Sequence, residues 1–350
     1  MGVALSFDIF AYDSSHAETL HGLIERAFSI VPPQARPKDS KAYLDYMQGP
    51  ANPSGPAIVA VARTGDTCIG NISATPFRFT TTSGQALTGY QLGSVVIDAA
   101  YQRQGIGTKL VGEITRHLAG IDDAFTYIYP NPRSYPVLLN SGYAAARDVP
   151  TYIHFPWAAS FPGLRPTARR WTFADGHGGA WQIEMADLDA VINAPGIGGA
   201  ATVNGFQRDS AYFAWRYGGP GADKRYRFAL VRHSQGEVFA VVCASHVFNG
   251  LRFVILNDNL SAHMTRHYVP ALEAARIIGG HSAERFVYVN SNIPRLLSAA
   301  PSADRAPWGM AVPNAVNPRP VRLLYYPVKG INLEVELNAS IAMTGDWMGF

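Results

Sequence analysis

The sequence has few cysteines and few charged residues. It contains 2 cysteines in 350 residues, and charged residues make up 16% of the chain. Cys68 and Cys243 lie in apolar, strand-like stretches and form no motif, so we expect buried thiols in a reducing compartment. The low charge, together with 47% hydrophobic residues, excludes a disordered chain and predicts a well-buried globular protein.

Concentrated positive charge and long apolar runs are also missing. The net charge of +3 comes without a run of Lys or Arg, whereas a surface that tracks phosphates needs such residues on one face. No apolar run reaches the roughly 18 residues that cross a bilayer. Residues 1–12 lack the basic and apolar parts of a signal peptide. We therefore expect a cytoplasmic protein with no nucleic acid and no membrane as partner.

The length favours two domains, because 350 residues exceed what one hydrophobic core usually organises. Strand and helix patterns mix through residue 155, which predicts an α/β domain with a mixed sheet over residues 1–158. Three prolines fall within 156–171, and we expect a linker at 159–171 and a second domain over 172–350. The second half repeats the order of elements without a residue-level repeat, which suggests duplication.

The segment at residues 101–110, "YQRQGIGTKL", is the strongest local signal for a binding site. A predicted strand over 90–98 ends just before it, and a helix is expected to begin near Gly107. The backbone N–H groups at a helix N-terminus and the helix dipole favour a phosphate or pyrophosphate. Glycine at 105 and 107 lets such an anion approach the backbone, because a Cβ would keep it away.

Two nucleotide-binding loops do not fit this segment. The dinucleotide fingerprint needs a third glycine where Leu110 stands, and the P-loop needs Lys before Thr, whereas Lys109 follows Thr108. Preceded by "SVVID" and followed by an amphipathic helix, Gln102, Gly105 and Gly107 resemble motif A of the GCN5-related N-acetyltransferase (GNAT) superfamily. The resemblance implies that this loop holds the pyrophosphate of acetyl-CoA or another acyl-CoA. The contacts it implies involve Val95, Val96, Ile97, Gln102, Arg103, Gln104, Gly105, Ile106, Gly107 and Thr108.

A second segment, from Asn131 to Gly142 and Tyr143, resembles motif B of the same superfamily. The resemblance implies that two neighbouring strands splay apart there, with the pantetheine arm of the donor between them and bonded by Asn131. Prolines on both sides of Asn131 fit a strand that stops pairing, because proline cannot donate to a strand ladder. The alternative is a turn in which the Asn131 side chain bonds its own backbone.

The implied reaction transfers an acyl group to a primary amine by direct attack, which needs a base for the amine and an acid for the leaving thiolate. Backbone N–H groups at 95–97 would polarise the thioester carbonyl. The family often has its thiolate acid, a Tyr, seven residues after the motif B Asn, where this sequence has Leu138. We choose Tyr135 as the acid, with Tyr129 as the other candidate.

Asp98 is the nearest carboxylate to the end of the predicted strand and is our candidate base. Capping of the loop is the alternative role for Asp98. His154 is a further candidate base, although a lone strand histidine is usually structural. Some tandem acetyltransferases use a C-terminal carboxylate, which in this sequence belongs to Phe350.

The second half lacks a Q/R-x-x-G-x-G loop. His263 and His267 lie four residues apart without the Glu of H-E-x-x-H, so we expect no metal. Residues 208–217 resemble a segment of bacterial two-domain GNAT-like proteins of surface-sugar and amino-sugar pathways. That resemblance implies a degenerate second GNAT-like domain, structural or lining the acceptor pocket, and an amino sugar as the acceptor. Three other acceptors stay open: an aminoglycoside, a polyamine and a protein lysine. The alternative function is that of a non-catalytic acyl-CoA sensor or assembly protein. A homodimer stays open as well.

Overall fold

The computed structural model describes residues 5–27, 41–149, 151–154, 170–174, 179–195, 205–221, 226–248, 251–261, 266–280, 286–290, 309–312, 321–328 and 331–339. The chain divides into two compact units. The first contains Met1–Arg147 and Arg322–Ala339, and the second contains Asp148–Val321. This division is discontinuous in sequence, unlike the contiguous ranges 1–158 and 172–350, and most of the expected linker lies outside the described residues.

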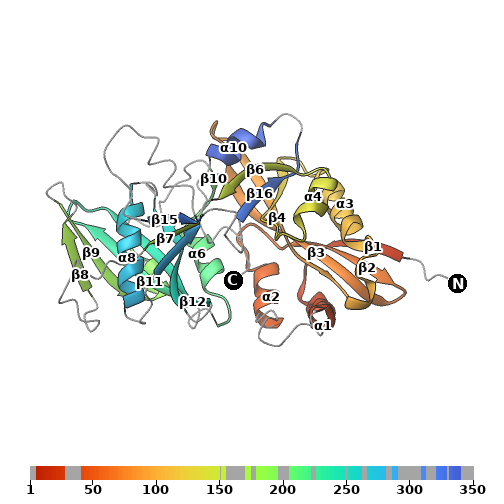
Figure 1. Ribbon diagram of the computed structural model, residues 1–350, viewed down its shortest axis with the longest axis horizontal. Coiled ribbons are helices and arrows are strands. Elements are labelled where there is room, and N and C mark those ends of the chain that lie inside the picture. The colour runs from red at the N-terminus through yellow and green to blue at the C-terminus, as the bar shows by residue number, and fades with distance from the viewer. Residues whose placement is uncertain are drawn as a thin grey trace. The chain divides into compact units, whose positions relative to one another are not determined.

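The first unit is built on a mixed sheet (Figure 1). Its strands follow the order β1 (Leu5–Ala11), β2 (Ile58–Thr64), β3 (Thr67–Thr80), β4 (Ala86–Ile97), β5 (Ala124–Ile128), β16 (Val321–Tyr325) and β6 (Ala144–Val149). The pairs from β1 to β4 are antiparallel, whereas β4 and β5 are parallel. A parallel pair needs a crossover connection, and helix α3 (Ile106–Leu118) supplies it.

Helices cover both faces of this sheet (Figure 1). Helix α3 packs with α4 (Tyr135–Asn140) on one face, where Leu110 and Ile114 meet Ile72 in a buried cluster. On the other face, α1 (Ala17–Ala27) buries Leu23 against Val61, and α2 (Lys41–Gln48) contacts α1. Helix α10 (Leu333–Ala339) also belongs to the first unit. Because strand side chains alternate between faces, α1 and α3 contact different residues of the same strands.

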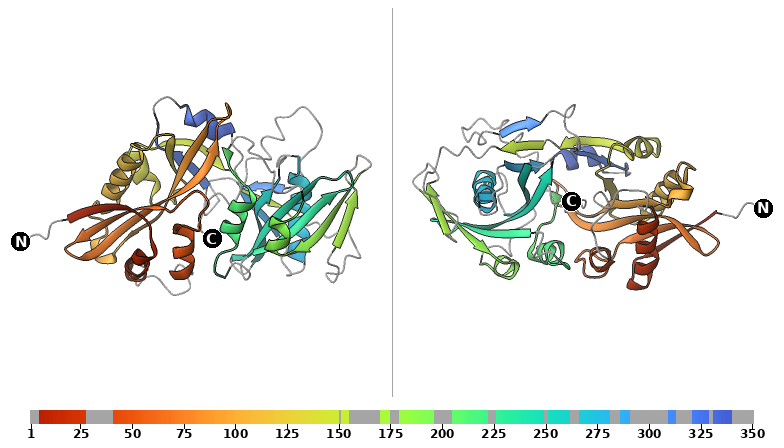
Figure 2. Two further views of the ribbon diagram at one scale, coloured as in Figure 1. Left: turned by 180° about the vertical axis from the view of Figure 1, so that it is seen from behind. Right: turned by 60° about the horizontal axis from the view of Figure 1, so that its bottom comes forward.

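The second unit has its own mixed sheet, with helix α8 (Tyr268–Gly280) packed on one face (Figure 2). Its strands follow the order β15 (Gly309–Val312), β7 (Thr151–His154), β14 (Phe286–Asn290), β13 (Leu251–Leu260), β12 (Val238–Phe248), β11 (Tyr226–His233), β9 (Ala180–Ala186) and β8 (Arg170–Ala174). Strands β13 and β14 are parallel, and α8 connects them. The unit also contains α5 (Leu188–Ile192), β10 (Gly205–Phe206) and α6 (Ser210–Tyr217).

Both halves therefore have the predicted α/β class, but two strands lie in unexpected sheets. The strand predicted at 151–155 is β7, which pairs with β14 and β15 in the second sheet instead of closing the first. Conversely, β16 pairs with β5 in the first sheet. Strand β6 was not predicted. The alternation in a short strand indicates which side chains are buried, but it does not indicate which strand is the pairing partner. The sequence pattern therefore could not place either strand in its sheet.

Both cysteines are buried, as predicted, and burial raises the pKa of the Cys68 thiol. No helix within the described ranges is both long and apolar enough to cross a membrane.

Candidate functional site

The loop between β4 and α3 turns through two residues with left-handed backbone. Arg103 has a φ of 62° and Gly105, which immediately precedes α3, has a φ of 76°. Position 105 therefore favours glycine, because this φ strains a residue with a Cβ. Helix α3 begins at Ile106, so the N–H groups of residues 106–108 have no acceptor within the helix. These donors and the helix dipole suit an anion at the predicted position, and binding of a pyrophosphate there stays a prediction.

Asp98 holds the start of this loop in place. Its Oδ1 accepts a hydrogen bond from the Ala100 N–H at 3.1 Å, which caps a 3-10 turn at Ala99–Tyr101. Its Oδ2 lies 2.9 Å from Nε of Arg26, a residue of α1. The carboxylate thus makes the capping contacts that we named as the alternative to its role as a base. Sequence reasoning missed Arg26, which lies 72 residues away and has no local motif.

The two glutamines of the motif also bond the backbone. Gln102 Nε2 donates to the carbonyl oxygen of Ile97 at 3.1 Å, and Gln104 Nε2 donates to that of Ala100 at 3.3 Å. Both side chains therefore stabilise the turn. Any contact that they make with a donor molecule stays a prediction.

The sheet opens next to this loop. The parallel ladder between β4 and β5 ends at the Gln91–Tyr127 pair, while β4 continues to Ile97. An extra residue lies in β4 between Gly93 and Val96, opposite Asn71 to Ser73 of β3, and such a bulge bends the strand. The Val95 side chain is 39% exposed, whereas Val96 is buried. β5 itself ends at Ile128, so the end of β4 has no described partner on that side, which we call the opening; that a donor lies there stays a prediction.

Asn131 follows β5 and starts the turn into α4. Its Oδ1 accepts hydrogen bonds from the N–H groups of Arg133 and Ser134, both at 2.9 Å. This is the turn role that we named as the alternative for this residue. A bond from Asn131 to the pantetheine arm stays a prediction, which the exposed side chain permits.

The two candidate acids and the residue at the family's usual position differ in environment. Leu138 is only 1% exposed in the cluster beneath α3, so it can play no polar role. Tyr135, the first residue of α4, packs against that cluster, and the Arg322 guanidinium carbon lies 4.6 Å from its ring centroid. The Tyr129 ring meets Tyr127 edge-on, with 6.1 Å between the ring centroids.

Gly142 and Tyr143 of the second motif have structural contacts. Gly142 has a φ of 89°, and a Cβ there would lie 3.3 Å from Tyr326. The Tyr143 hydroxyl lies 2.8 Å from Thr115 Oγ1 and donates to Thr126 Oγ1 at 3.2 Å. Burial raises the pKa of Tyr143 to about 12, so it stays neutral at physiological pH. This tyrosine thus joins α3, β5 and the end of α4.

The remaining sequence candidates lie elsewhere. His154 is the last residue of β7, in the second unit, whereas we expected it in the first domain. Phe350 and His263 lie outside the described residues. His267 Nε2 lies 2.9 Å from Glu237 Oε2. Within the described ranges, His, Cys, Asp and Glu side chains form no group of three or more that could hold a metal ion.

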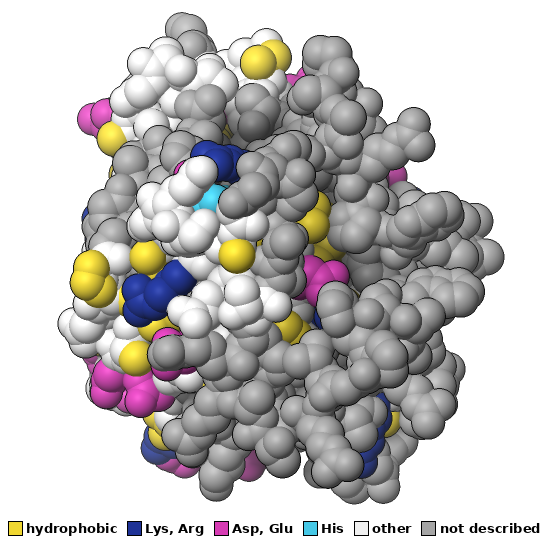
Figure 3. Space-filling view, turned by 90° about the vertical axis from the view of Figure 1, so that its left-hand side faces the viewer, with side chains coloured by type: hydrophobic (Ala, Val, Ile, Leu, Met, Phe, Trp, Pro, Cys, Tyr) yellow, Lys and Arg dark blue, Asp and Glu magenta, His cyan; other side chains and the backbone are white. Residues whose placement is uncertain are grey.

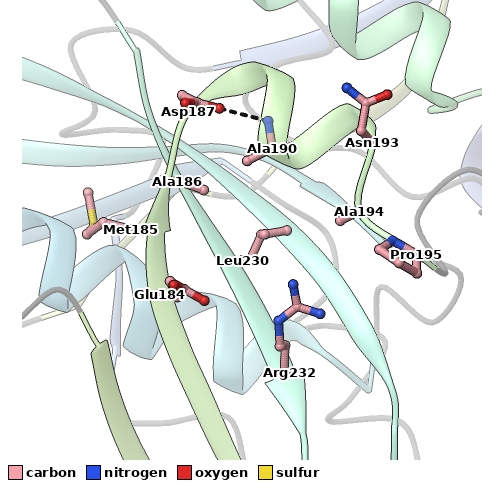
Figure 4. A pocket seen from close by; sticks show the side chains of 10 residues that line it. All are labelled: Glu184, Met185, Ala186, Asp187, Ala190, Asn193, Ala194, Pro195, Leu230 and Arg232. Atoms are coloured by element: carbon pink, nitrogen blue, oxygen red, sulfur yellow. Dashed lines mark hydrogen bonds between the residues drawn. The ribbon is translucent and has the colours of Figure 1, made fainter.

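The second unit has a hollow of about 740 Å³ (Figure 4). It is lined by Glu184, Met185, Ala186, Asp187, Ala190, Asn193, Ala194, Pro195, Leu230 and Arg232. Asp187 Oδ1 accepts from the Ala190 N–H at 2.7 Å and so caps α5. The hollow carries both signs of charge, and sequence reasoning assigned it no motif.

The fold and the loop define a class: an α/β domain with a parallel strand pair, whose crossover helix begins at a glycine loop and has first N–H groups without an acceptor in the helix. Residues 9–146 match the family model described as acetyltransferase (GNAT) domain. These residues therefore have the pattern of a GNAT domain, a family whose members transfer acyl groups from acyl-CoA. No curated protein matches the chain.

Solved structures share the fold over both units. A GCN5-related N-acetyltransferase from Anabaena variabilis is 13% identical, with a TM-score of 0.59 over 91% of this chain and 72% of that one. One from Kribbella flavida is 14% identical, with a TM-score of 0.55 over 93% and 72%. A probable N-acyltransferase from Enterococcus faecalis is 13% identical, with a TM-score of 0.56 over 91% and 72%. At such identities the likeness shows the fold alone.

Proposed function

We propose that this protein transfers the acyl group of an acyl-CoA, acetyl-CoA first among them, to the primary amine of a small molecule such as an amino sugar. The observation that carries the proposal is the glycine loop at the start of α3 beside the opening between β4 and β5. An anion site and a gap between strands suit the two ends of one extended donor: the pyrophosphate and the pantetheine arm.

The chain's own groups suggest how each part would be held. The N–H groups of residues 106–108 would face a pyrophosphate at the helix N-terminus, and the exposed Arg103 adds positive charge there. The backbone of residues 95–97 has no β5 partner among the described residues, so its N–H groups are placed to polarise a thioester carbonyl.

In the proposed reaction the neutral amine attacks the thioester carbonyl, a C–N bond forms, the C–S bond breaks, and CoA leaves as a thiolate. Tyr135 then protonates the thiolate, and the proton of the amine passes to a base. Asp98 is the nearest carboxylate, reached through water, although its contacts with Ala100 and Arg26 favour the capping role.

The second unit is proposed to be a GNAT-like domain that serves acceptor recognition or structure. Around the parallel pair β13 and β14 it repeats the strand order of the first sheet. We further propose a cytoplasmic protein that needs no nucleic acid, membrane or metal; a homodimer stays open. On the face shown in Figure 3, the described basic and acidic side chains are interspersed, whereas a surface that binds nucleic acid gathers basic side chains.

The test is release of free CoA thiol when the protein is mixed with acetyl-CoA and a panel of primary amines: glucosamine, an aminoglycoside, spermidine and a lysine peptide. We expect release with glucosamine and little with the others. Binding of acetyl-CoA by calorimetry without thiol release from any amine would favour the alternative, a non-catalytic acyl-CoA sensor. Propionyl-CoA and longer donors in the same assay give the preferred acyl length.

A further inference from the structure

Three polar side chains form a buried stripe on the first sheet: Asn71 and Thr75 of β3 and Gln91 of β4. They are 1%, 1% and 4% exposed, respectively. Asn71 Oδ1, Thr75 Oγ1 and Gln91 Oε1 have no hydrogen-bond partner in the part of the chain that the structure describes. Burying such an atom without a partner costs free energy, so native proteins rarely do so without a reason.

The strand register places the three side chains on one face. Asn71 and Thr75 are four residues apart in β3 and point the same way, and Gln91 lies directly opposite Thr75. Asn71 also pairs with Val61, which packs with α1. The stripe therefore lies on the α1 face, whereas α3 and its anion site are on the other face.

The stripe also ends at the opening between the strands. Gln91 is the last residue of β4 that pairs with β5, and its partner is Tyr127. A donor whose pyrophosphate sits at α3 and whose arm passes through the opening would bring its thioester out beside Gln91, on the face of the stripe.

We propose that this stripe binds the acceptor, and that the acceptor is an amine bearing several hydroxyl groups, as an amino sugar does. This inference rests on the proposed function. Amide and hydroxyl groups exchange hydrogen bonds with hydroxyls without charge. A polyamine would bring extra ammonium groups, and positions 71, 73, 75 and 91 hold no carboxylate to pair with them.

The chain offers a matched control. Ser73 lies on the same face between Asn71 and Thr75, but its hydroxyl already donates to the Gly93 carbonyl oxygen at 3.3 Å. Thr75→Val and Gln91→Met replace unpartnered polar atoms by apolar groups of similar size. Neither change removes a protein hydrogen bond, so both variants should fold at least as stably as the wild type.

The experiment compares glucosamine with cyclohexylamine, which has the amine and no hydroxyls. In Thr75→Val and Gln91→Met we expect kcat/KM for glucosamine to fall roughly three- to tenfold, the worth of one hydrogen bond. Values for cyclohexylamine, the Kd of acetyl-CoA and the melting temperature should not fall. Ser73→Ala should leave the preference for glucosamine unchanged. An unchanged preference in both test variants, or an equal loss in Ser73→Ala, would overturn the proposal.

Failure of the proposed function gives a different result. If the wild type releases no CoA with any amine, binding of glucosamine in the presence of CoA is followed by saturation-transfer NMR. Binding that weakens in Thr75→Val supports the stripe even without turnover. Absence of glucosamine binding to the wild type contradicts it.

Discussion

The two sheets share a strand order around their parallel pairs but differ where each pair meets its crossover helix. In the first unit, left-handed Gly105 leads into α3 and leaves the first N–H groups of the helix for an anion. In the second unit, His267 lies directly before α8, 3% exposed, and bonds Ser261 and Glu237 through its two ring nitrogens. The same local topology thus leaves helix N–H groups open in the first unit, where we propose the donor binds, and has a side-chain network in the second.

Each sheet also has a bulge in the strand that leads to its crossover helix. Strand β13 has an extra residue, Asn257, between Leu256 and Asp258, much as β4 has one beside Val95. Asp258 is fully buried, and Arg208 Nε donates to it at 2.9 Å and the Tyr217 hydroxyl at 3.0 Å. An internal ion pair fills the place beside this bulge, although Asn257 and Asn259 keep buried atoms without partners. In the second unit the bulged strand therefore serves the unit's own stability, whereas our proposal places a ligand beside the bulge of the first.

The largest expected effect is on stability, when the buried carboxylate beside the bulge of β13 is removed. Asp258→Ala leaves the Arg208 guanidinium buried without its counter-charge, which costs about 3 to 5 kcal/mol in the free energy of unfolding. Urea unfolding followed by tryptophan fluorescence measures this loss, and acyl-CoA affinity of the folded variant should not change. The double variant Arg208→Met/Asp258→Leu removes both charges and should recover most of the loss. A single variant as stable as the wild type would refute the structural role of the pair.

The matching change in the first unit is Gly107→Glu. A Cβ at Gly107 would lie 4.0 Å from Ile97, so the fold should accept a side chain. A carboxylate about 4 Å from the pyrophosphate costs about 1 to 4 kcal/mol, depending on the effective dielectric. Calorimetry should therefore show acetyl-CoA affinity reduced roughly 5- to 1,000-fold. Gly112→Glu, later in α3, is the control for added charge. Equal acetyl-CoA affinity of the two variants would show that the pyrophosphate does not bind at Gly107.

Tyr135→Phe tests the proposed acid at the start of α4. Loss of a general acid lowers kcat by roughly 100-fold or more, and the Kd of acetyl-CoA should stay the same. Tyr129→Phe is the matched variant and should keep its kcat. The reverse outcome, with activity lost only in Tyr129→Phe, would move the acid to the end of β5.

The smallest effect concerns Tyr143, which joins elements that frame the opening. Tyr143→Phe removes a hydroxyl bonded to Thr115 and Thr126, at a cost of about 1 kcal/mol at neutral pH. Because the folded-state pKa is raised from 10.0 to about 12, the wild type loses stability as pH rises between these values. The variant lacks this loss, so the two denaturation curves should converge above pH 10. Parallel curves would show that Tyr143 does not titrate with unfolding.

Sequence patterns predicted the local features well. The glycine spacing at 105 and 107, the amphipathic α3 and the strand before them are local, so each could be read from a few residues. The placement of β7 in the second sheet and of β16 in the first could not be read from the sequence, because pairing partners are set by contacts between distant segments. Alternating Asn71, Ser73 and Thr75 indicate one polar face of a strand; only the structure shows that this face is buried.

The central claim is that one unit binds the donor and the other does not. Isothermal titration of the wild type with acetyl-CoA tests it most directly through the stoichiometry, with Gly107→Glu titrated alongside. The account predicts one site per chain in the wild type and a loss of that site in the variant. Two sites per chain, or a single site that Gly107→Glu leaves intact, would contradict it.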